Sequence, residues 1–169
     1  SMRPSAWRPA SSPPSTSPLG SARVPSDPAS PATGGTAPQR LVILAEGSLD
    51  AHGGKTAFGV LRYGERPVVA VIDSTRAPGR MGDVRRLPGR EDVPIVASVD
   101  EALALPEPPD ALLIGIAPTG GKLPDAWRRP LLRAIEARLD IISGLHTFLA
   151  DDPELAAAAT TAGVTLHDV

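Results

Sequence analysis

The chain has 169 residues, 41% of them hydrophobic, which suits a single domain with one core. Its formal net charge of −2, from 17 basic and 19 acidic residues, gives no electrostatic reason to expect nucleic acid or an anionic membrane as a partner. Without cysteine the chain has no disulfides or thiolate metal sites, and no apolar run reaches the roughly 18 residues of a membrane span. The cytoplasm is therefore the expected compartment.

The first 39 residues are rich in proline, serine, alanine and glycine and show no apolar period. Ser1-Met2 has the form of a tag remnant. We expect residues 1–39 to be a disordered tail, because such a segment buries too little surface to offset the entropy of ordering. A docking segment and a targeting peptide are the alternatives, although the prolines argue against the amphipathic helix of a targeting peptide. One folded domain, residues 40–169, should follow.

In chain order, this domain begins with a short apolar run of the kind found in strands buried on both faces. A helix is expected over 55–63, followed by a long loop at 74–92 with room for one helical turn. A short helix should follow Ser98, which forms a capping box with Glu101. The next helix falls within 123–139 and should begin near Arg128, because Pro130 is tolerated only in a first turn or at a bend. The last helix is expected at 152–161, and the strands at 41–45, 68–72, 94–97, 111–116, 140–143 and 164–166.

Alternation of strands and helices predicts an α/β fold, a Rossmann-like doubly wound parallel sheet. Numbered along the chain, the strands should follow the order 3-2-1-4-5-6. This order makes 41–45 and 111–116 neighbours. Ligands of open α/β sheets bind beyond the carboxyl ends of such a pair, so we expect the site there.

The chain has only two lysines, and each follows a pair of glycines after one of these two strands. Glycines let the backbone approach a ligand, and an ammonium beside free N–H groups suits a phosphate or carboxylate. We therefore expect a small anionic ligand here. The simpler interpretation is that the glycines form turns and the lysines face water, and neither loop has the P-loop or Gly-x-Gly-x-x-Gly spacing. The residues assigned to this site are Gly47, Gly53, Gly54, Lys55, Thr56, Pro118, Gly120, Gly121 and Lys122.

Two acidic residues end the first two strands. Asp73, followed by Ser74, lies where dinucleotide-binding domains place an acid on a ribose hydroxyl, but it could equally open a turn or cap a helix. Glu46 could act as a general base or form an ion pair with Lys55 or Lys122.

His146 follows the strand at 140–143, in the segment Ser143-Gly144-Leu145-His146. An imidazole at that edge could transfer protons near neutral pH, although a lone histidine often only caps a helix or fills space. Ser143 and Gly144 would contact the ligand. Neither metal-ligand spacing nor a Ser-His-Asp set can be assigned.

From Arg40 to Val169 the chain resembles the N-terminal domain of the domain-of-unknown-function family that includes the D-glutamate N-acetyltransferase DgcN. The resemblance implies a Rossmann-like domain that binds acetyl-CoA or the amino acid, with His146 or Glu46 handling the proton. It also implies a C-terminal P-loop domain as partner, without which this domain should be inactive. The matching segments are Leu44-Ala45-Glu46-Gly47, Lys55-Thr56-Ala57, Gly59-Val60-Leu61-Arg62-Tyr63, Val69-Ala70-Val71-Ile72-Asp73-Ser74, Gly115-Ile116-Ala117-Pro118 and Ser143-Gly144-Leu145-His146-Thr147-Phe148-Leu149.

Two other functions remain open. A non-catalytic ligand-binding or assembly module would use the same site to sense an anion or nucleotide and would pair with another domain. A homo-oligomer is also possible. An NAD-dependent oxidoreductase would use the same fold and Asp73, but the chain lacks the glycine fingerprint of that class.

Overall fold

The computed structural model describes residues 38–49, 53–116, 118 and 120–169. The disorder expected for 1–39 therefore falls almost wholly outside the described residues. Gln39, within the expected tail, is described: its side chain donates to Asp140 Oδ2 at 3.0 Å and accepts from Arg66 at 3.2 Å. Within the described ranges, none of the helices has the length and apolarity needed to cross a membrane.

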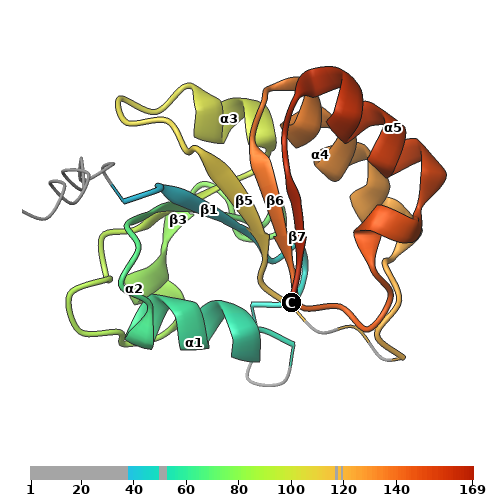
Figure 1. Cartoon of the computed structure of the whole chain (residues 1–169). Coiled ribbons are helices and arrows are strands. Elements are labelled where there is room, and N and C mark those ends of the chain that lie inside the picture. The colour runs from blue at the N-terminus through green and yellow to red at the C-terminus, as the bar shows by residue number, and fades with distance from the viewer. Residues whose placement is uncertain (1–37, 50–52, 117, 119) are drawn as a thin grey trace, which may run out of the picture. The chain divides into compact units, whose positions relative to one another are not determined.

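A seven-stranded sheet forms the centre of the domain (Figure 1), in the order β3-β4-β2-β1-β5-β6-β7. All neighbouring strands run parallel except β3, which is antiparallel to β4. The predicted α/β Rossmann-like class is confirmed. The strands are β1 (Leu41–Leu44), β2 (Val68–Ile72), β3 (Gly79–Arg80), β4 (Pro94–Val96), β5 (Ala111–Ile114), β6 (Asp140–Ser143) and β7 (Leu166–Asp168).

The strand order differs from the prediction in one detail, the extra edge strand β3. Its two residues lie in the segment expected to be a loop and pair with Ile95 and Pro94 of β4. A two-residue strand has no apolar alternation by which it could be recognised. The last strand also begins later than expected, since Gly163 ends the preceding helix at φ 70° and the Thr165 N–H donates to Asp140 Oδ1.

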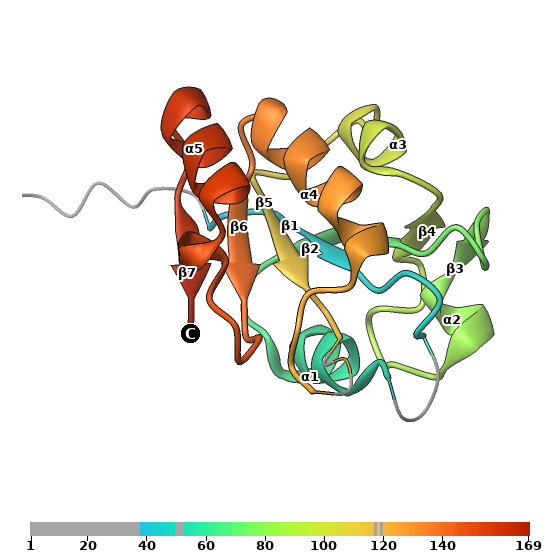
Figure 2. The same cartoon turned by 90° about the vertical axis from the view of Figure 1, so that its right-hand side faces the viewer.

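Helices cover both faces of the sheet (Figure 2). The first two lie on one face and the other three α-helices on the opposite face, as in a doubly wound fold. They are α1 (Lys55–Tyr63), α2 (Met81–Val84), α3 (Val99–Leu103), α4 (Asp125–Glu136) and α5 (Pro153–Ala162), with a 3-10 turn η1 (Leu149–Asp151) before α5. Only half of the predicted capping box of α3 forms: Ser98 Oγ accepts from the Glu101 N–H, whereas the Glu101 carboxylate accepts from the N–H of Ala97 rather than of Ser98.

The start of α4 was predicted wrongly. The helix begins at Asp125 rather than near Arg128, so Pro130 lies in its second turn. Proline has no N–H, and the carbonyl of Ala126 therefore loses its usual donor. Ala126 is exposed, so water can hydrate that carbonyl. One side of the helix, with Trp127, Leu131 and Ile135, is buried against the sheet and holds this register.

Close packing between α1 and β5 places the start of α1 at the carboxyl edge of the sheet. The Ala57 N–H donates to the Gly115 carbonyl at 2.7 Å. A Cβ on Gly115 would lie 2.2 Å from Ile43 Cγ2 and 3.0 Å from Ala57 Cβ. Only glycine allows this approach of helix to sheet.

Candidate functional site

The two strands expected to flank the site are neighbours. β1 and β5 pair in parallel, with Leu44 opposite Ile114 at their carboxyl ends. In Figure 2 the loop after β5 and the start of α1 both lie beyond this edge. The chain segments that carry the predicted site residues therefore leave the sheet on one side.

Glu46 and Ser74 contact each other directly at this edge. The Ser74 N–H donates to Glu46 Oε2 at 2.9 Å, and the Ser74 hydroxyl makes a short hydrogen bond to Glu46 Oε1. Both donors are neutral, so the carboxylate is held in place without being neutralised. The structure thus brings together two predicted site residues that are 28 positions apart in the sequence.

Asp73 is fully buried, with 0% of its surface exposed. Its Oδ1 accepts from the Gly47 N–H at 3.1 Å and from the N–H and hydroxyl of Thr75 at 3.0 and 2.6 Å. Gly47 has φ 64°, which glycine adopts without strain. Among the described residues Oδ2 accepts no hydrogen bond, and the nearest cation is Arg76 Nε at 3.7 Å. This geometry is that of a residue that closes a turn, the alternative to the predicted ribose contact.

The first Gly-Gly-Lys element lies at the start of α1. Gly54 is the buried N-cap residue and Gly53 precedes it, while Lys55 and Thr56 are exposed in the first turn. Lys122, in the second element, is also exposed. Within the described part of the chain neither lysine forms an ion pair. Both ammonium groups are therefore open to solvent or a ligand.

The loops after β5 and β6 pack against each other. Gly120 and Gly121 have φ values of 84° and 66°, and the Gly121 N–H donates to the Pro118 carbonyl at 2.9 Å. A Cβ on Gly121 would lie 2.7 to 2.9 Å from three atoms of His146, and the Thr147 N–H donates to the Gly121 carbonyl. The predicted residues Gly121 and His146 are thus in contact.

The turn after β6 is held by a buried serine. Ser143 Oγ accepts from the Leu145 N–H at 3.2 Å, and Gly144 between them is exposed. His146 is exposed as well. In the described ranges no group of three His, Cys, Asp or Glu side chains is arranged to hold a metal ion.

A hollow of about 420 Å³ opens beside Glu46 and Ser74, between α4, the start of α3 and the carboxyl ends of β2 and β4. None of the described residues in 53–56 and 118–122 lines it, so it lies apart from the described parts of both Gly-Gly-Lys elements. We call it the α4 hollow. Its lining residues are Glu46, Ile72, Ser74, Ala97, Ser98, Val99, Asp100, Ala126, Arg129, Pro130 and Arg133.

The α4 side of this hollow was not among the residues predicted from the sequence. Ala126, Arg129, Pro130 and Arg133 follow helical spacing and form one stripe beside the buried stripe of α4. This helical spacing could have indicated from the sequence that the four residues share one face of the helix. Arg133 pairs with Asp100 at 2.6 Å, whereas Arg129 forms no ion pair with any described residue.

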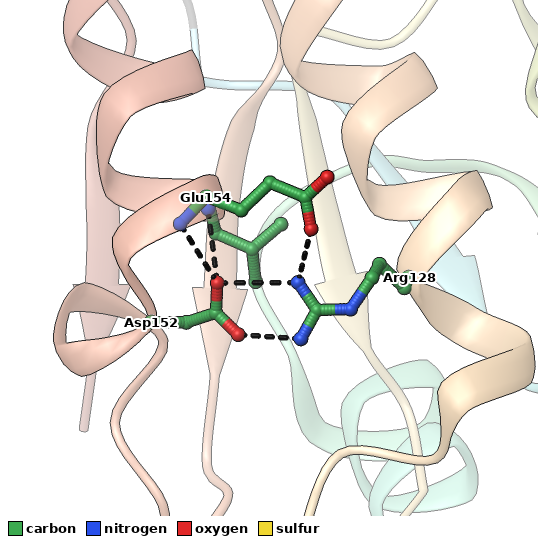
Figure 3. A network of polar contacts seen from close by, with 4 residues as sticks. Arg128, Asp152 and Glu154 are labelled. Carbon is green, nitrogen blue, oxygen red and sulfur yellow. Dashed lines mark hydrogen bonds and ion pairs between the residues drawn. The ribbon is translucent and has the colours of Figure 1, made fainter.

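An ion-pair network fixes α4 relative to α5 (Figure 3). Arg128 reaches from α4 to the start of α5, where Nη2 contacts Asp152 Oδ2 at 2.5 Å and Nη1 contacts Glu154 Oε2 at 2.6 Å. Asp152 also caps α5, since its Oδ1 accepts from the N–H groups of Glu154 and Leu155. The hydrogen bond from Arg128 lowers the pKa of Asp152 to about 2, and the two carboxylates raise the pKa of Arg128. The neighbouring Arg129 is therefore carried by a well-anchored segment.

The chain was compared with family models, curated proteins and solved structures, and each comparison gives a match. The family model of the DUF1611_N Rossmann-like domain, a domain of unknown function, matches residues 79–169. A D-glutamate N-acetyltransferase from Tritonibacter scottomollicae is 50% identical over 58 residues, which are 34% of this chain and 17% of that protein. A crystal structure of a DUF1611 family protein from Anabaena variabilis matches with a TM-score of 0.68 and 40% identity, over 78% of this chain and 36% of that chain. The chain thus spans about a third of the solved relative.

Proposed function

Because this chain belongs to the family of the DUF1611_N Rossmann-like domain, we propose that it is the Rossmann-like part of an N-acetyltransferase for an acidic amino acid such as D-glutamate. Support for the reaction comes from the relative named D-glutamate N-acetyltransferase, which shares half of the residues in the matched segment. In this proposal, the carboxyl edge of the sheet binds the amino acid or acetyl-CoA.

The proposed reaction makes definite demands on a site. The substrate ammonium must lose a proton before its nitrogen can attack the thioester carbonyl of acetyl-CoA. A C–N bond then forms, the C–S bond breaks and the coenzyme leaves as a thiolate that takes up a proton. A proton acceptor is therefore needed, together with donors or cations for the carboxylates and phosphates.

The observation that carries the proposal is that candidate proton acceptors and exposed cations both lie in segments that follow the carboxyl ends of the strands, at one edge of the sheet. Glu46 and His146 are the candidate proton acceptors, and Lys55 and Lys122 are exposed cations without ion-pair partners in the described residues. Gly120 and Gly121, both at positive φ, let the backbone approach a ligand near Lys122. If acetyl-CoA binds there, the lysines would hold its phosphates.

We expect the chain alone to bind a ligand but not to catalyse the acetylation. The solved relative is almost three times as long as the part matched here, and a P-loop domain like that implied by the resemblance would complete the site. An appreciable rate of D-glutamate acetylation by the full 169-residue chain would contradict this division of roles.

Thermal unfolding tests ligand binding directly. The full chain should melt at a higher temperature with acetyl-CoA or D-glutamate but not with NAD; a ligand at 100 times its dissociation constant stabilises by about 2.7 kcal/mol. Lys55→Ala and Lys122→Ala should reduce the shift caused by acetyl-CoA. The control is Arg86→Ala, which removes an exposed cation elsewhere. No shift with either ligand would reject the proposal, and a shift with NAD alone would favour an oxidoreductase.

A further inference from the structure

The α4 hollow contains two opposite charges that form no ion pair with any residue that the structure describes. Of its four charged lining residues, Arg133 and Asp100 neutralise each other at 2.6 Å. Among the described residues, Glu46 accepts hydrogen bonds only from the backbone and hydroxyl of Ser74, which are neutral donors. Arg129 forms no ion pair within the described ranges. The hollow therefore presents one carboxylate and one guanidinium that a ligand could match.

We propose that the α4 hollow binds a free amino acid as a zwitterion, with Arg129 on a carboxylate and Glu46 on the ammonium. A ligand with only negative charge would be attracted by Arg129 but repelled by Glu46. A simple amine would be attracted by Glu46 but repelled by Arg129. A molecule with both charges satisfies both residues. The inference deepens the proposed function and rests on it, because it names the site of the amino-acid substrate.

The rest of the lining suits the carbon chain of an acidic amino acid. Ile72, Val99 and Pro130 supply apolar surface for methylene groups, and about 420 Å³ leaves room for a small ligand. Ser98 Oγ accepts from the Glu101 N–H, which leaves its own proton free to donate to a second carboxylate. An ammonium beside Glu46 would also be next to the proton acceptor that the reaction needs.

Two charge-removing substitutions separate the two contacts. Calorimetric titration of the full chain should compare D-glutamate with glutarate, which has both carboxylates but no ammonium. Wild type should bind D-glutamate more tightly than glutarate. Arg129→Gln should raise the dissociation constants of both ligands about tenfold. Glu46→Gln keeps an oxygen that can accept from Ser74, but it should remove the preference for D-glutamate.

Matched controls are Arg86→Gln and Glu65→Gln, which remove exposed charges outside the hollow and should bind like wild type. Circular dichroism melting confirms that each variant folds. If D-glutamate binds Arg129→Gln and Glu46→Gln as tightly as wild type but is lost in Lys55→Ala or Lys122→Ala, the inference is wrong and the proposed function stands. If acetyl-CoA binds and D-glutamate does not, this site is again wrong. If neither ligand binds wild type, the proposed function fails as well.

Discussion

Gly121 is the residue whose backbone most directly limits the position of His146. It has φ 66°, and a Cβ would lie 2.7 Å from His146 Cγ and 2.8 Å from its Cβ. Gly121→Ala should therefore displace the histidine and destabilise the domain by about 2 kcal/mol, the sum of an unfavourable φ and a steric contact.

Gly120→Ala provides the matched control. Gly120 also has a positive φ, 84°, but a Cβ there would meet nothing within 4 Å. The Gly120→Ala variant should lose only about 1 kcal/mol of the free energy of unfolding, as measured by chemical denaturation. Equal losses for the two variants would show that the contact with His146 does not constrain this loop.

Asp152 combines a helix cap with an ion pair, and two substitutions separate these roles. Asp152→Asn keeps a capping side chain but loses the charge beside Arg128, so the free energy of unfolding should fall by about 1 kcal/mol, as for a partly exposed pair. Asp152→Ala also loses the cap and should cost about 1 kcal/mol more. Chemical denaturation near neutral pH measures the free energy of unfolding of both variants. If Asp152→Ala is as stable as Asp152→Asn, the side chain of Asp152 does not stabilise the helix as a cap.

The same pair predicts how stability depends on pH. The pKa of Asp152 is lowered from an ordinary value near 3.8 to about 2, mainly by hydrogen bonding to Arg128. A carboxylate with a lowered pKa stabilises the folded state above the unfolded-state pKa, and this contribution is lost as pH falls through the folded-state pKa. Arg40 lowers the pKa of Asp110, so Asp110 acts in the same direction.

Wild type should therefore lose its advantage over Asp152→Asn as pH falls from about 4 to about 2. Denaturation series of the two proteins across this range measure that difference. A constant difference down to the lowest pH would mean that the ion pair does not stabilise the fold.

At the scale of single residues, Glu46, Ser74, Gly121 and His146 could be chosen as candidates from the sequence, but the contacts between Glu46 and Ser74 and between Gly121 and His146 could not be predicted. It singled out the lysines because only two occur, and it overlooked Arg129 among 15 arginines. The partners of Arg128 could not be predicted either, because they depend on how α4 packs against α5.

Among the elements, the contact between α1 and β5 should be the most sensitive to added volume. Gly115→Ala would place a methyl group 2.2 Å from Ile43 Cγ2 and 3.2 Å from the Leu44 carbonyl oxygen. Overpacking of this kind costs about 1–3 kcal/mol. The start of α1, which carries Lys55, should move with it.

Gly59→Ala, in α1, should instead raise the stability of the domain. A Cβ at Gly59 would meet nothing within 4 Å, and alanine is favoured over glycine in helix interiors by about 0.5–1 kcal/mol. Denaturation midpoints of the two variants should therefore move in opposite directions. A gain in stability with Gly115→Ala would contradict the close packing described here.

Elements with a strong apolar pattern were predictable. The helix at 55–63 was predicted with its observed bounds, and the buried strands that follow it occur where the apolar runs lie. The misses have physical causes: β3 is held by pairing with β4 rather than by a pattern of its own, and tertiary burial of Trp127 and Leu131 overrides the preference of Pro130 for a first turn.

For the whole molecule, the strand order apart from β3 could be predicted from the sequence, but the position of the α4 hollow does not follow from that order. Adjacency of β1 and β5 was predictable from the alternation of strands and helices. The hollow instead depends on side chains of α4 and on the start of α3, which meet only in the folded domain.

In the proposed function, the carboxyl edge of this sheet binds the ligands of an acetyl-transfer reaction. Backbone amide shifts of the full chain, followed during titration with acetyl-CoA and then with D-glutamate, test it most directly. We predict that the largest changes fall in the segments after β1, β2, β5 and β6 and in the first turns of α4. Changes confined to the opposite edge of the sheet, or no changes with either ligand, would show that these ligands do not bind at the carboxyl edge.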